Sequence, residues 1–104
     1  MRTLRFIIQG QKLKQAPGCD FSGIVPGTEG YLKARFEFDS EWDGCKKAAS
    51  FFRAGGEEFA APIANNECGI PAEALTRGKF FVSVTGMRKG FKITTNKIDV
   101  LQGG

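Results

Sequence analysis

Histidine is absent from this chain. Its absence removes the commonest general base, the commonest zinc ligand and the usual partner that activates a nucleophile. No imidazole is therefore available to activate the hydroxyl of Ser40, Ser50 or Ser83 as a nucleophile. The composition argues against hydrolytic and zinc chemistry, so we expect a protein that is not an enzyme, with no catalytic residue, no cofactor and no metal.

The chain has only three cysteines, which is an odd number. Cys19, Cys45 and Cys68 are widely spaced and contain no C-x-x-C pair, so they outline neither a zinc site nor a disulfide framework. The pattern favours reduced, buried thiols in a protein made in a cytoplasm. One disulfide plus one free thiol is the alternative.

Long apolar runs are also missing. No stretch approaches the ~20 residues that span a bilayer. The first residues, Met1 to Gln9, return to polar side chains too soon for a secretory signal. We expect no signal peptide and no contact with a membrane.

Phenylalanine, in contrast, is abundant, with 10 copies against one Tyr and one Trp. Large flat side chains suit the space of ~10 Å between two stacked sheets. The 14 glycines fall mostly between apolar runs and so mark turns. A chain of 104 residues can bury one core without disulfides, and we expect a single domain over residues 1–104.

Strict alternation is clearest over residues 31–39. The apolar members are Leu32, Ala34, Phe36 and Phe38, and charged residues stand between them. A period of two with one charged face indicates a half-buried strand. We therefore predict that Phe36 and Phe38 both point into the core.

Further strands are expected at 3–8, 12–16, 46–53, 58–63, 68–70, 79–85 and 91–101, with a short one at 22–25. One helical turn is expected at 71–75, because Pro71 suits its first position, and 86–90 reads as a hairpin loop. Ile93 and Val100 have opposite parity, which predicts a bulge near Thr95 and Asn96. Seven or eight short strands indicate an all-β fold, a single small antiparallel β-sandwich of Ig-like or jelly-roll-like type.

Trp42 lies in a turn beside Asp43 and Gly44. One interpretation is that its ring caps the end of the sandwich and packs over the edge of the core. The other is an exposed anchor for a partner, since tryptophan is enriched in the centres of interfaces.

The carboxylates Glu37, Asp39, Glu41 and Asp43 recur at every second residue. Such a ladder could bind calcium, but no Asp-x-Asn-x-Asp-Gly loop is present. The simpler interpretation is the solvent face of a strand.

Charge is distributed unevenly: residues 1–20 carry +3, residues 21–75 carry −4 and residues 76–104 carry +5. Basic ends around an acidic middle fit three alternatives: a nucleic-acid patch with stacking aromatics such as Phe91, a self-complementary surface, or a merely solvated one. The candidate interaction residues are Trp42, Arg88, Lys89 and Lys92.

Four segments in order carry a resemblance to a known family: the run from Phe36 to Gly44, the strand ending at Phe52, the run from Cys68 to Glu73, and Gly86 followed by Ile93-Thr94-Thr95-Asn96. Together they resemble a domain of tail and baseplate structural proteins in phages and prophages of Gram-positive bacteria. Cys45 stands where that pattern has an aromatic residue.

The resemblance implies a small β-sandwich module of a virion, in the tail, the baseplate or the capsid surface. It also implies contacts with other copies or with a larger virion protein, and a location in the virion after synthesis in the cytoplasm of a host bacterium. We expect either a stand-alone accessory protein or a domain excised from a longer chain. The alternative function is a small basic phage-encoded protein that binds nucleic acid or inhibits a host protein.

Overall fold

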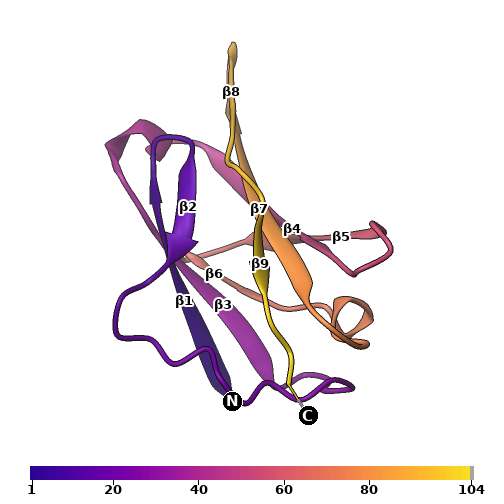
Figure 1. The fold of residues 1–104 in the computed structure, drawn as a ribbon. Helices are drawn as coiled ribbons and strands as arrows, with labels where there is room; N and C mark the ends of the chain where they lie inside the picture. Colours follow the sequence, from indigo (N-terminus) through magenta and orange to yellow (C-terminus); the bar gives the residue numbers. More distant parts are fainter. Residues whose placement is uncertain (104) are drawn as a thin grey trace.

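Alternating apolar positions fold into two stacked sheets in the computed structural model, which describes residues 1–103 (Figure 1). Two single-turn 3-10 helices, η1 (Ser40–Trp42) and η2 (Ala72–Ala74), join strands. The nine strands are β1 (Arg2–Gln9), β2 (Lys12–Gln15), β3 (Leu32–Phe38), β4 (Lys46–Phe52), β5 (Glu58–Ile63), β6 (Glu67–Gly69), β7 (Phe80–Arg88), β8 (Phe91–Thr94) and β9 (Ile98–Val100). The all-β sandwich expected from the sequence is confirmed.

The first sheet has the order β2-β1-β3-β6, and the second has the order β5-β4-β7-β8 with β9 also paired to β7. All pairs are antiparallel except β1 and β3, which run parallel with Phe6 opposite Phe36. A two-residue turn cannot join parallel strands, and here residues 10–31, which include the antiparallel strand β2, make the longer connection that such a pair needs. This parallel pair departs from the purely antiparallel sandwich that we expected.

The core lies between the inward faces of the two sheets. Phe6 and Phe36 are each 1% exposed, and their rings stack with centroids 5.3 Å apart. Phe51 and Val82 face them from the second sheet and are fully buried. Phe38, at the end of β3, is only partly buried, so the predicted inward orientation holds fully for Phe36 and partly for Phe38.

Two predicted elements are wrong. Residues 22–25 form no strand; Ile24 is nevertheless buried, and its carbonyl oxygen accepts the backbone N–H of Gly103 at 2.9 Å. The expected loop at 86–90 is shorter, because β7 continues to Arg88 and leaves only Lys89 and Gly90 as the turn. The predicted helical turn near Pro71 is present as η2.

The predicted one-residue offset near Thr95 and Asn96 is present, since Thr94 lies opposite Thr85 and Ile98 lies opposite Val82. It is an interruption rather than a bulge within one strand, because β8 ends at Thr94 and β9 begins at Ile98. The Thr95 hydroxyl accepts the backbone N–H of Val84 at 2.9 Å. The Asn96 side chain then bonds both backbone groups of Leu13 in the opposite sheet: Oδ1 accepts the N–H at 2.7 Å, and Nδ2 donates to the carbonyl at 3.3 Å. A side-chain amide thus mimics a strand's backbone and links the two sheets.

Replacing Asn96 with alanine is therefore expected to lower the free energy of unfolding by about 1–3 kcal/mol, because the Leu13 groups lose their partner. Urea denaturation measures this, and Gln9→Ala, at an exposed strand position, is the matched control. Equal stability of the two variants would show that the link contributes nothing.

Candidate interaction surface

The turn between β1 and β2 is clamped by residues of the Phe36–Gly44 segment. Asp39 Oδ2 accepts the backbone N–H of Gly10 at 2.6 Å, and its Oδ1 accepts that of Glu41 at 3.1 Å, which caps η1. The indole Nε1 of Trp42 donates to the Gly10 carbonyl at 2.8 Å. Gly10 has φ +58°, a conformation that a glycine adopts without strain. Asp39 and Trp42 therefore have structural roles, because both hydrogen-bond to the backbone of Gly10.

Trp42 is fully buried at the end of the core. Its ring lies 5.2 Å from that of Phe38 and packs directly on Gly86, where an added Cβ would come within 2.7 Å of the indole carbons. The interpretation of Trp42 as an exposed interface anchor is wrong. The structure shows the other interpretation, a cap over the core.

Arg88 is held by η1 and the turn that follows it. Its guanidinium donates to the carbonyl oxygens of Glu41 at 3.1 Å and Asp43 at 2.9 Å, and it lies 4.0 Å from the centroid of the Phe91 ring. These contacts orient the guanidinium, but Arg88 remains exposed and takes part in no salt bridge within residues 1–103. Its role as an interaction residue stays a prediction. Sequence reasoning missed the contacts because the two carbonyls lie more than forty residues away along the chain.

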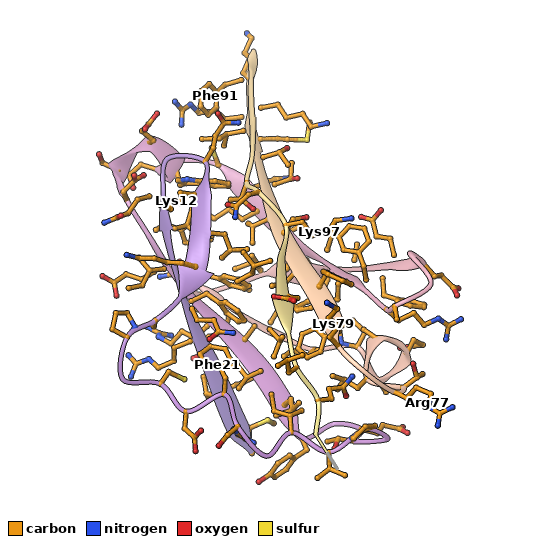
Figure 2. The ribbon with its side chains drawn as sticks, viewed as in Figure 1. Lys12, Phe21, Arg77, Lys79, Phe91 and Lys97 are labelled. Atoms are coloured by element: carbon orange, nitrogen blue, oxygen red, sulfur yellow. The ribbon has the colours of Figure 1, made fainter. Side chains whose placement is uncertain are left out.

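Lys89 and Lys92 are the other two charged residues predicted for interaction. Both are exposed, and within residues 1–103 neither takes part in a salt bridge. The hairpin of β7 and β8 that carries them projects beyond the body of the sandwich (Figure 1). Figure 2 shows Phe91 near the tip of the same hairpin. Of the four predicted interaction residues, Trp42 is buried, whereas Arg88, Lys89 and Lys92 are exposed and outside any salt bridge within the described residues.

The outer face of the second sheet, turned away from the core, is poor in charge. Directly opposite residues of neighbouring strands share a face, so the register defines four rows across it. The rows are Lys46, Met87 and Lys92; Pro62, Ala48, Thr85 and Thr94; Ala60, Ser50 and Ser83; and Glu58, Phe52, Phe81 and Asp99. The two middle rows contain seven small or hydroxyl-bearing residues and no charge.

A shallow depression of about 370 Å³ lies at the basic end of this outer face. Its lining contains no carboxylate and consists of Lys46, Lys47, Ala48, Thr85, Met87 and Arg88. Met87 is 55% exposed there. Sequence reasoning missed this surface because the run Ala48-Ala49-Ser50 has small residues on both faces and shows no period.

The outer face of the first sheet is different, because it carries more charged side chains and three of them form ion pairs. Glu67 bonds Lys33 at 3.2 Å and Arg35 at 2.9 Å. These two cations hold the pKa of the Glu67 carboxyl below its usual value, the Lys33 hydrogen bond having the larger effect. We interpret this face as the solvated one.

The three cysteines are free thiols. Cys45 and Cys68 are buried and Cys19 is partly buried; burial raises the pKa of the Cys68 thiol to about 12. Cys68 is therefore protonated at neutral pH and unreactive. The carboxylate ladder does not converge, since no group of three possible ligands that could hold a metal occurs among residues 1–103.

No family model, no curated protein and no solved structure matches this chain in the comparisons. Within residues 1–103, no helix is long and apolar enough to cross a membrane. Any function must therefore be argued from the surfaces described above and from the resemblance of the motifs.

Proposed function

We propose that this protein is a non-enzymatic structural or accessory component of a phage particle, in the tail, the baseplate or the capsid surface, and that it acts through protein–protein contacts. Its partner is another copy of itself or a larger virion protein. The protein is made in the cytoplasm of the host bacterium and resides in the virion.

The proposal rests on one observation: the motifs that carry the resemblance have structural roles in this fold. Asp39 and Trp42 clamp the first turn, Gly86 admits the indole ring, and Asn96 links the two sheets. Motifs of this kind fix a rigid shape, which a repeated building block requires. The nearly uncharged middle of the outer face then offers a surface for packing against a neighbour.

Mass spectrometry of purified particles tests the proposal. We expect the chain to follow the particles through a density gradient at a constant ratio to the other structural proteins. The opposite result is a chain left in the unassembled fraction, bound to a host protein or to nucleic acid. Binding to nucleic acid would weaken steeply as salt rises, because phosphate contacts release counterions, and would support the alternative of a small basic binding protein.

A further inference from the structure

Two lysines flank an exposed methionine at the basic end of the outer face. Lys46, Met87 and Lys92 lie directly opposite one another on three adjacent strands, and their side chains share one face. Neither lysine takes part in a salt bridge within residues 1–103. Like charges held on one face repel each other, so a negatively charged partner at this row would be favoured.

The surface beside this row is apolar rather than charged. Ala48 and Thr85 line the depression of about 370 Å³ and have Pro62 and Thr94 as their outer neighbours. The flexible thioether of Met87 adapts its shape to the side chain that it contacts. The depression has more than enough room for one apolar side chain; Lys46 lines it, and Lys92 lies beside it opposite Met87.

We propose that this basic end of the outer face, made of Lys46, Ala48, Thr85, Met87 and Lys92, binds an acidic protein segment with a central apolar side chain. The apolar side chain packs against Met87 in the depression, and carboxylates on either side of it pair with the two lysines. The inference deepens the proposed function, on which it rests for the nature of the partner as a protein.

Nucleic acid fits the same surface less well. Single strands bind by stacking bases on open aromatic faces beside cations. Here the nearby rings already hold cations: Arg88 lies 4.0 Å from the centroid of Phe91, and Lys97 lies 3.8 Å from that of Phe52. An apolar depression without an aromatic residue favours a protein side chain over a base.

A second copy of this chain also fits less well. A two-fold axis across the strands would bring the opposite end of the outer face, with Glu58 and Asp99, onto the lysines. Asp99 already pairs with Lys79 at 3.4 Å, and Glu58 accepts a hydrogen bond from Ser50 at 2.6 Å. Lys97 adds a further cation there. That end therefore carries no net negative charge to offer.

A nuclear magnetic resonance titration of the ¹⁵N-labelled protein tests the inference. The probe is a short acetylated peptide of aspartate and glutamate with one central leucine, and the control peptide has glycine in its place. We expect saturable shifts of the backbone amides over residues 46–48 and 85–88, and at least about tenfold weaker binding of the control peptide, since burying an isobutyl group is worth more than 1.4 kcal/mol.

The variant Lys46→Glu/Lys92→Glu should weaken binding of the leucine peptide about tenfold or more. Lys14→Glu, on the outer face of the first sheet, should leave it unchanged and is the matched control. All three lysines are exposed, so each variant should keep the dispersed spectrum of the folded protein.

Three outcomes would overturn the inference: no saturable shift up to millimolar peptide, equal binding of the two peptides, or tighter binding of a thymidine oligonucleotide to the same amides. If the protein binds the peptide but is absent from purified particles, the binding surface is supported and the proposed function is contradicted. If the protein is present in particles but does not bind the peptide, the proposed function is supported and the binding surface is contradicted.

Discussion

Replacing Trp42 with alanine is expected to lower the free energy of unfolding by about 3–5 kcal/mol, because a fully buried ring leaves a large cavity. The Gly10 carbonyl loses its indole donor, and the space beside Gly86 is left empty. A domain of this size has about 5–15 kcal/mol in total, so the loss should be plain in a urea or thermal unfolding curve.

Two further variants test the cause of that loss. Trp42→Phe keeps part of the ring volume but not the Nε1–H donor, so it should cost less than Trp42→Ala. Gly86→Ala should also destabilise, by about 1–3 kcal/mol, because its Cβ would press on the indole. If Trp42→Ala changed stability by no more than an exposed substitution, the indole ring would not be part of the core.

The second large effect is expected for Phe36→Ala, again about 3–5 kcal/mol, since the ring is 1% exposed and stacks on Phe6. Phe38→Ala should cost less because that ring is only partly buried. Glu37→Ala, between them on the exposed face, should be nearly silent. Thermal melts of the three variants give the order, and a larger effect for Glu37 than for Phe36 would mean that the faces of β3 are exchanged.

Most of the fold could be predicted because, in a strand whose apolar and charged residues alternate, the apolar face must turn toward the core. Residues 31–39 show this, and so does the change of parity between Ile93 and Val100, which located the irregularity at Thr95 and Asn96, although as a bulge rather than as the end of one strand and the start of another. The parallel pairing of β1 and β3 could not be predicted, because alternation fixes the face of a strand but not its neighbour or direction.

The candidate surface was harder to predict for two physical reasons. Charge alone does not reveal which groups a cation contacts, and Arg88 turned out to bond carbonyls that only the fold brings close. Small residues carry no periodic signal, so the outer positions Ala48 and Ser50 could not be told from the inner Ala49. Lys89 and Lys92 are exposed on the projecting hairpin, as candidate interaction residues must be, and their contact with a partner stays a prediction.

Photo-crosslinking inside assembled particles would examine the proposed role and the proposed surface together. A photoreactive amino acid would replace Met87 in one variant and Lys14 in the other, since both side chains are exposed but lie on opposite faces of the sandwich. We predict that the variant at Met87 forms a cross-link to one virion protein, through a peptide rich in aspartate and glutamate, and that the variant at Lys14 does not. Equal cross-linking at both positions, or cross-links from Met87 only to nucleic acid, would contradict the account.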